Sequence, residues 1–273
     1  MLKENAVKRL IGEKQMTELP FAVLCQLISA VGGFLLSRAM FFDGYAPLGI
    51  AAAAGMPAGL SVAAGIGACM GYFIPVTGSG AIRYIGAVVT VTMLKWLIPD
   101  KFKFARTSGF CALLGWVGSL SGLLFISSFE DFAMCAIEGL LCASGAYFVS
   151  QVAAMRNVVR SPHGIGQHEL VNSAVVAAML LMSLAQVQIA HISLAHIAAV
   201  WLVLAAARFG RESAGAIVGA AFGFAMSLAG DNIMFLAGAY ALGGAAAGLF
   251  ARFGAAGCCP ALLISSSGIF IQS

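Results

Sequence analysis

The chain has 273 residues, of which 61% are hydrophobic and only 10% are Asp, Glu, Lys or Arg, whereas charged residues make up about 25% of an average soluble domain. Its formal net charge is +4, but no basic tract with interleaved aromatics is present, which argues against nucleic-acid binding. Apolar stretches of about twenty residues follow one another, each long enough to cross a hydrocarbon layer of about 30 Å. This composition excludes a soluble enzyme and predicts an all-α membrane protein, a glycine-rich polytopic helical bundle of about nine to eleven spans.

The N-terminal segment, residues 1–19, is charged and amphipathic. Because no small-residue cleavage site closes the apolar run after it, we expect a retained cytoplasmic segment and not a signal peptide. Residues 20–273 are then one polytopic transmembrane domain, which we expect to be cut in or after its last span because the chain stays apolar almost to Ser273. The predicted spans are 20–38, 82–98, 108–127, 132–152, 170–187, 192–207, 213–229, 233–251 and 257–273.

An apolar segment, residues 46–74, lies between the first two spans and is broken by Pro57 and rich in glycine. It is long for one helix and short for two full crossings. Cytoplasmic connections of membrane proteins carry the excess of Lys and Arg, and the connections 101–106, 156–160 and 208–211 are all basic. They share the cytoplasmic side with the N-terminus only if 46–74 crosses twice or not at all. We therefore predict a re-entrant segment or two short spans, in a multi-pass protein of the cell membrane.

Many glycines recur at four-residue spacing, which lets helix backbones approach closely in lipid. This spacing predicts a tight bundle, and a seam between two copies of the chain is the alternative use of the same glycines. The predicted packing positions are Gly67, Gly71, Gly215, Gly219, Gly223, Gly244 and Gly248.

Three ionisable residues lie within or near predicted spans: Arg38, Arg83 and Glu138. A charge inside the membrane is costly, so each is a functional candidate by default. Glu138 is six residues into a span, about 9 Å deep, and both arginines stand at outer helix ends, so an ion pair between Glu138 and one of them is predicted. The alternatives are arginines that reach the interface beside a protonated or hydrogen-bonded Glu138, and a path for a solute or proton. Lys95 is placed at the inner end of its span.

No catalytic, cofactor-binding or metal-binding residue is predicted. A metal-dependent phosphatase needs several carboxylates around two divalent ions, but the four aspartates lie in separate loops with no common face. His191 and His196 are five residues apart, whereas two ligands on one helix face need a spacing of about three or four. The seven cysteines show no CxxC spacing and are interpreted as small apolar side chains.

Three stretches resemble the membrane region of stage II sporulation protein E from endospore-forming bacteria. In GFLLSRAMFFDGYAPLGIA, residues 33–51, a first span ends before Arg38 and Pro47 opens a second apolar run. Residues 207–259 are similar to the family's glycine-rich late spans, joined by a short polar turn. AIEGLLCASGAYFVSQ, residues 136–151, is similar to its mid-region span with one buried Glu. The order of spans also matches, so the resemblance covers most of the chain.

The resemblance implies about ten spans, then a cytoplasmic region for self-association and for contact with the tubulin-like division protein, then a manganese-dependent serine phosphatase of the PPM type. That phosphatase dephosphorylates an anti-anti-sigma factor and so releases the forespore sigma factor. Both cytoplasmic parts are missing from this chain, so we expect no cofactor here, with manganese for the missing domain. The expected function is to anchor and localise the phosphatase at the polar division septum. The expected partners are the lipid bilayer, a second copy and division-septum proteins.

A second function remains open from the same residues. Discontinuous helices often frame substrate sites in transporters, and the broken segment 46–74 together with the buried Glu138 fits that pattern. The alternative is therefore a small-solute or ion transporter, or a subunit of one. Against it stands the lack of convergent polar residues at mid-membrane.

Overall fold

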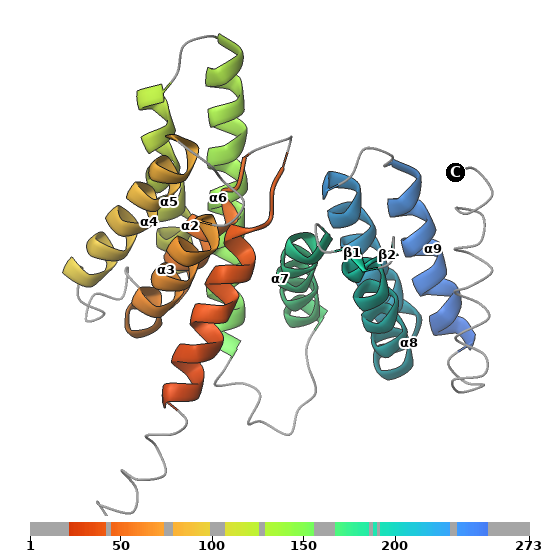
Figure 1. Cartoon of the computed structure of the whole chain (residues 1–273). Helices are drawn as coiled ribbons and strands as arrows, with labels where there is room; N and C mark the ends of the chain where they lie inside the picture. Colours follow the sequence, from red (N-terminus) through yellow and green to blue (C-terminus); the bar gives the residue numbers. More distant parts are fainter. Residues whose placement is uncertain are drawn as a thin grey trace, which may run out of the picture.

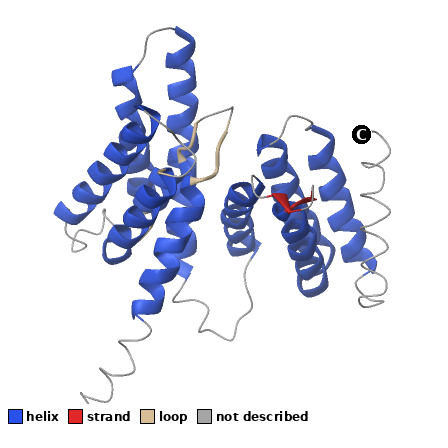
Figure 2. Cartoon of the chain, viewed as in Figure 1, coloured by secondary structure: helices blue, strands red, loops and turns tan. Residues whose placement is uncertain are grey.

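The computed structural model describes residues 22–41, 45–73, 79–98, 107–125, 129–155, 167–185, 188–189, 192–229 and 234–250, which are almost entirely helical (Figures 1 and 2). The first helix, Ala22–Ser37, is the unlabelled red helix of Figure 1. A two-residue strand pair that the sequence does not predict, β1 (Gln188–Ile189) with β2 (Ile192–Ser193), is antiparallel. The other helices are α2 (Leu48–Gly55), α3 (Ala58–Tyr72), α4 (Ser79–Leu97), α5 (Ser108–Ser119), the short η2 (Leu120–Phe125), α6 (Phe129–Met155), α7 (Gln167–Ala185), α8 (Leu194–Ala229) and α9 (Met234–Leu249).

Helices α2 and α3 form a hairpin. Met56 and Pro57 between them are extended, with ψ of 149° and 152°, and Pro57 has no N–H with which to continue a helix. The chain reverses here, because Tyr72 at the end of α3 hydrogen-bonds Ala46 just before α2. Residues 46–73 thus enter the bundle and turn back, which brings Tyr72 at the end of α3 beside Ala46 at the start of the segment.

Helix α2 is enclosed on all sides by protein. All eight of its residues are buried, and α3, α4, α5 and α6 each pack against it. At a rise of 1.5 Å per residue it is about 12 Å long, less than half of a bilayer's hydrocarbon thickness of about 30 Å. Its sequence, LGIAAAAG, suits this place because alanine and glycine let the surrounding backbones approach closely.

Helix α8 is a single run of 36 helical residues that turns back on itself. In a straight helix Ala207 and Gly215 would be about 12 Å apart along the axis. Here a Cβ on Gly215 would lie 3.1 Å from the Cβ of Ala207, and Gly244 of α9 faces both Val203 and Gly215. The two arms of α8 therefore lie side by side against α9, and they coincide with the separately predicted spans 192–207 and 213–229.

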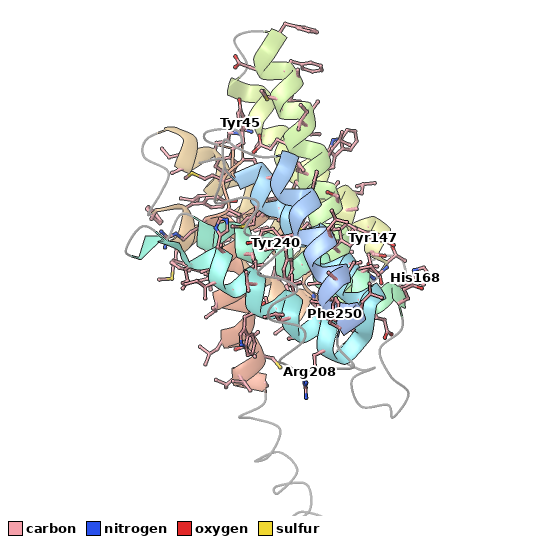
Figure 3. The ribbon with its side chains drawn as sticks, turned by 90° about the vertical axis from the view of Figure 1, so that its right-hand side faces the viewer. Tyr45, Tyr147, His168, Arg208, Tyr240 and Phe250 are labelled. Atoms are coloured by element: carbon pink, nitrogen blue, oxygen red, sulfur yellow. The ribbon has the colours of Figure 1, made fainter. Side chains whose placement is uncertain are left out.

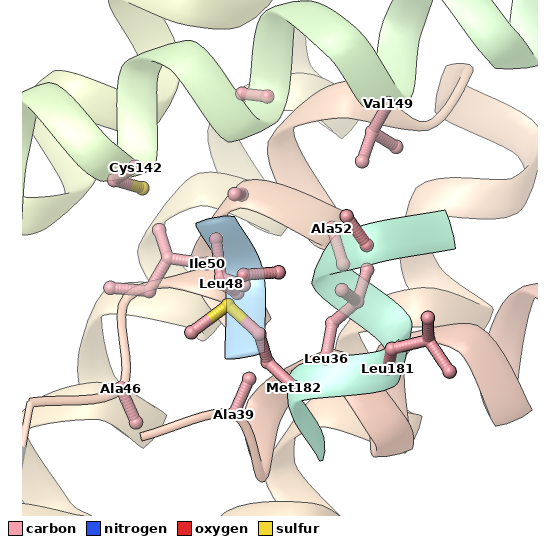
Figure 4. Packing of buried hydrophobic residues seen from close by; sticks show 14 of the residues in the cluster. Leu36, Ala39, Ala46, Leu48, Ile50, Ala52, Cys142, Val149, Leu181 and Met182 are labelled. Carbon is pink, nitrogen blue, oxygen red and sulfur yellow. The ribbon is translucent and has the colours of Figure 1, made fainter. Parts of the chain in front are cut away.

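The side chains are sorted by size, with small residues inside and many large apolar residues outside. Ala51, Ala52, Ala53 and Ala54 are all buried, whereas Trp96, Phe129 and Trp201 are 79%, 84% and 71% exposed. Figure 4 shows the interior, where Leu48 and Ile50 of α2 lie between Cys142 of α6 and Met182 of α7. An extended apolar exterior marks a membrane or protein contact surface, and here it supports membrane association.

Helix lengths do not confirm the predicted number of nine to eleven spans. Two described helices, Asp131–Met155 and Gln167–Leu184, are long and apolar enough to cross a bilayer, and the other apolar helices have 10–17 residues. The predicted span 108–127 illustrates the reason, since the α-helix ends at Ser119 and η2 follows. The predicted cytoplasmic segment 1–19 and the last predicted span, 257–273, lie outside the described residues.

Candidate functional site

An ion pair joins α4 to α6. The Arg83 guanidinium contacts the Glu138 carboxylate, and these side chains are only 15% and 1% exposed. Gly122 of η2 makes room for the guanidinium, because a Cβ there would lie 2.8 Å from Arg83 Cζ. Glu138 Oε1 is buried and accepts no hydrogen bond from a described residue. The carboxylate therefore contacts the arginine through one oxygen, and the Tyr84 hydroxyl also hydrogen-bonds this carboxyl group.

Two stacked tyrosines hydrogen-bond Ala46, which directly precedes Pro47 and α2. The rings of Tyr72 and Tyr84 have centroids 5.0 Å apart and planes at 15°. Tyr72 Oη donates to the Ala46 oxygen at 2.6 Å, and the Ala46 N–H donates to Tyr84 Oη at 3.1 Å. Arg83 lies over the Tyr84 ring, 5.1 Å from its centroid. These residues and Glu138 form what we call the entry cluster: Tyr72, Arg83, Tyr84 and Glu138.

A buried lysine closes the opposite end of α2. Lys95 of α4 is 5% exposed, and its Nζ donates to the main-chain oxygens of Ala54 and Met56. The same atom lies 3.7 Å from Cys111 Sγ of α5. The last carbonyl groups of a helix have no partner within it, and a cation near them is favoured by the helix dipole. Lys95 therefore supplies the donors that the break at Pro57 removes.

The neighbouring carbonyl groups at this end of α2 are paired as well. The Met56 N–H donates to the Ala52 oxygen at 3.2 Å, and Ser61 Oγ donates to the Ala53 oxygen at 2.7 Å. Arg83 and Lys95 are twelve residues apart on α4, which corresponds to about 18 Å along the helix. One helix, α4, thus carries a cation to each end of the enclosed hairpin.

Arg38 does not share in the ion pair. Its guanidinium lies 5.8 Å from the centroid of the Phe34 ring in the first helix, and its Nε is buried without a hydrogen-bond partner among the described residues. Of the three ionisable residues singled out in the sequence, the structure brings together Arg83 and Glu138 and leaves Arg38 apart.

The glycines expected to pack helices in the first half lie where α3 meets the first helix. A Cβ on Gly67 would overlap the main chain of Ala30, and one on Gly71 would overlap the side chain of Ser37. Ser29 Oγ also donates to the Leu60 oxygen at 3.0 Å across this contact. The two backbones are therefore nearly in contact, as small residues permit.

The glycines of the second half lie where α8 meets α9. Gly215 and Gly244 face each other so closely that a Cβ on either would overlap the main chain of the other. A Cβ on Gly219 would likewise overlap the main chain of Tyr240. Two further predicted positions, Gly223 and Gly248, are buried. Gly215, Gly219 and Gly244 thus pack helices of the same chain against each other.

The arrangement holds the backbone in place and offers little chemistry. Within the described residues no three His, Cys, Asp or Glu side chains are grouped as metal ligands would be. Asp43, Asp100, Asp231 and His191 lie outside the described residues. In both clusters around α2, protein donors meet protein acceptors, which is the pattern of a structural support.

Sequence reasoning missed Lys95, Tyr72 and Tyr84. Lys95 was expected at the inner helix end, but the structure buries its ammonium group against main-chain oxygens. The signal was the Gly-Met-Pro break at residues 55–57, which leaves carbonyl groups unpaired, together with a lysine at the end of the second helix after the break. The tyrosines gave no comparable signal, because aromatic residues near helix ends are common in membrane proteins.

The comparisons with known proteins agree with the resemblance seen in the sequence. A family model described as SpoIIE, N-terminal domain, matches residues 3–272. No curated protein and no solved structure gave a match. Because the matched range includes the whole α2–α3 hairpin and both clusters at its ends, the fold and its site lie within this domain. The chain belongs to the SpoIIE N-terminal domain family.

Proposed function

We propose that this chain is the membrane-anchoring and localising domain of a sporulation-specific protein serine phosphatase. In this proposal it directs the phosphatase to the polar division septum and so serves activation of the forespore sigma factor. The observation that carries the proposal is the SpoIIE N-terminal match over residues 3–272. The helical fold with bulky apolar side chains on its outside supports the anchoring part. In this proposal the catalytic activity, with its manganese, is assigned to a separate phosphatase domain and not to this one.

The hairpin supports a multi-pass topology with a cytoplasmic N-terminus. In this topology α2 and α3 enter and leave the membrane on the same side. The hairpin therefore does not change the direction in which the later helices cross. The basic connections then fall on the cytoplasmic side, as the distribution of Lys and Arg requires. Figure 3 shows Tyr45, in the first outer connection, toward one end of the molecule and Arg208, in a proposed inner connection, at the other.

Short helices are compatible with this topology. The first helix, Ala22–Ser37, is about 24 Å long, which is less than the usual hydrocarbon thickness of about 30 Å. A bilayer thins locally around short spans at a modest cost, and flanking residues reach toward the interface. We therefore place these helices in the membrane together with their flanking segments.

Self-association, which we also propose, needs a surface other than the glycine stripes. Gly67, Gly215 and Gly244 face other helices of the same chain. Contact between copies, or with division-septum proteins, would then use the large apolar residues outside. This surface is shared with lipid, so the affinity would depend on shape and not on burial from water.

A transporter is the alternative function, and one observation favours it. Helix α2 is a short enclosed helix with an ionisable side chain near each end, as in transporters with broken helices. In those proteins the freed backbone groups bind substrate and ions. Here the carbonyl groups are paired with Lys95 and Ser61, which favours the anchoring function.

A fluorescent fusion of residues 1–273 in sporulating cells tests the proposed localisation. We expect the fusion to concentrate at the polar septum, whereas a fusion to an unrelated multi-pass protein of similar size should label the whole membrane. Uniform fluorescence of both fusions would contradict a localising role. In a separate assay, the purified chain with manganese should not hydrolyse phosphoserine substrates. Turnover that requires metal and is lost in Asp43→Asn would show that this chain is itself an enzyme.

A further inference from the structure

We propose that the break between α2 and α3 is a binding site for a monovalent cation, and that the chain fills it with its own ammonium group, that of Lys95. Two main-chain oxygens, from Ala54 and Met56, converge on Lys95 Nζ. They belong to the last turn of a helix and to the extended residue after it. This inference is independent of the anchoring function, since it concerns how the hairpin is held.

The site has the features by which proteins bind free monovalent cations. Unwound backbone and helix C-terminal ends present carbonyl oxygens with partial negative charge, and such groups coordinate sodium ions in transporters with broken helices. An ammonium group has three N–H donors, so it can replace an ion with a similar set of oxygens. Because the lysine is 5% exposed, the ammonium group is bound away from solvent as an enclosed ion would be.

The neighbouring donors are already engaged, so the donors for the Ala54 and Met56 oxygens come from another helix. Ser61 Oγ already serves the Ala53 oxygen at 2.7 Å, and the Met56 N–H serves the Ala52 oxygen. Pro57 has no N–H to offer. The oxygens of Ala54 and Met56 belong to residues two apart in the sequence, and Lys95 Nζ donates to both. One small cation with several donors meets this demand.

Tethering has a functional consequence for the hairpin. A free ion would leave when its concentration falls, whereas an ammonium group on α4 remains at a fixed position. The α2–α3 hairpin is then a permanent support and its C-terminal end does not exchange ions with either side of the membrane. This separates the chain from transporters in which the corresponding carbonyl groups bind their coupling ions.

Chemical replacement of the side chain tests the site. Lys95→Ala removes three carbons and the nitrogen, which together correspond to n-propylammonium. We expect the detergent-solubilised Lys95→Ala protein to unfold at a temperature lower by about 5 °C or more, and n-propylammonium chloride to restore at least half of that loss. Choline chloride at the same ionic strength and n-propanol at the same concentration should restore little, because neither offers a charged N–H donor. Equal recovery with n-propanol would overturn the proposal, since a filled cavity would then suffice.

Two further variants keep the test decisive if Lys95→Ala does not fold. Lys95→Met retains the apolar volume but removes the charge and the donors, and Lys95→Gln retains donors without charge. We expect the order wild type, then Lys95→Gln, then Lys95→Met in unfolding temperature, with no gain from n-propylammonium in Lys95→Met, where the space is occupied. A Lys95→Met protein as stable as the wild type would show that the carbonyl groups need no cation.

Discussion

Tyr72 and Tyr84, which lie on different helices, hydrogen-bond the main-chain oxygen and the N–H of the same residue, Ala46. Their rings stack, while Tyr72 Oη donates to the Ala46 oxygen and Tyr84 Oη accepts from the Ala46 N–H. Ala46 precedes Pro47, so its backbone groups lie outside the regular ladder of α2. A buried main-chain group without a partner is costly. The tyrosine pair therefore fixes the point where the chain enters the hairpin.

Removing one of these hydroxyls should destabilise the protein. Tyr72→Phe keeps the stacked ring but leaves the Ala46 oxygen buried without its donor, which costs about 1–3 kcal/mol. We expect the unfolding temperature of the detergent-solubilised protein to fall by several degrees. Tyr147→Phe is the matched control, because Tyr147 is 38% exposed and should change little. Equal values for the two variants would contradict the role of the hydroxyl.

Changing one member of the Arg83–Glu138 ion pair should destabilise the protein more than changing both members. Glu138→Gln leaves the guanidinium buried without a counter-charge, which costs about 3–5 kcal/mol. Adding Arg83→Gln should recover part of the lost stability, whereas adding Arg38→Gln should not, because Arg38 lies apart from the pair. A double-mutant cycle measured by thermal unfolding gives both values. If neither double variant recovers stability and Glu138→Gln instead abolishes uptake of an ion or solute, the transporter function is correct.

Glycines at helix contacts should differ from glycines in open positions. Gly67→Ala places a Cβ against the main chain of Ala30, and overpacking of this kind costs about 1–3 kcal/mol. Gly59→Ala on the same helix meets no atom within 4 Å and should be neutral or slightly stabilising because alanine favours helix. In the second half, Gly244→Ala and Gly238→Ala form the same contrast. Unfolding temperatures that do not separate the members of either pair would argue against the observed helix contacts.

Cysteine labelling in intact cells tests the topology. In a cysteine-free background, single cysteines at Arg106 and Arg160 should be protected from an impermeant thiol reagent, because the proposed topology places the basic connections in the cytoplasm. A cysteine at Asp43 should react, since the proposed topology places that connection outside. Permeabilised cells provide the control, in which all three should react. Labelling of Arg106→Cys or Arg160→Cys in intact cells would refute the assignment.

Much of the fold could be predicted because the apolar runs, the basic connections and the proline break can each be recognised from a short stretch of sequence. The family resemblance is confirmed by the SpoIIE N-terminal match. The break at Pro57 predicted the position of a hairpin, and the spans 192–207 and 213–229 match the two arms of α8. Helix lengths were less predictable, because an apolar run does not show where η2 replaces the α-helix after Ser119.

The site was harder to predict because it depends on which helices become neighbours. Lys95 stands near the end of an apolar run, where lysines usually reach for water, so only the position of the α2 end beside it reveals its role. The same holds for the choice between Arg38 and Arg83 as neighbours of Glu138. Residue spacing shows how deep a side chain lies along a helix. Which way the side chain faces, and which helix lies beside it, is known only from the assembled bundle.

The enclosure of α2 has a consequence for the order of events during synthesis. The side chains that hydrogen-bond the backbone at the two ends of α2, those of Ser61, Tyr72, Tyr84 and Lys95, all lie later in the chain than the helix itself. Val149 of α6, whose side chain faces Gly55, follows only after most of the first half of the bundle. At a synthesis rate of about 5–20 residues per second, α2 waits several seconds for these partners. During that interval its free carbonyl groups have only water, lipid headgroups or the insertion machinery as partners. The hairpin therefore reaches its final packing only after the helices that follow it have been synthesised.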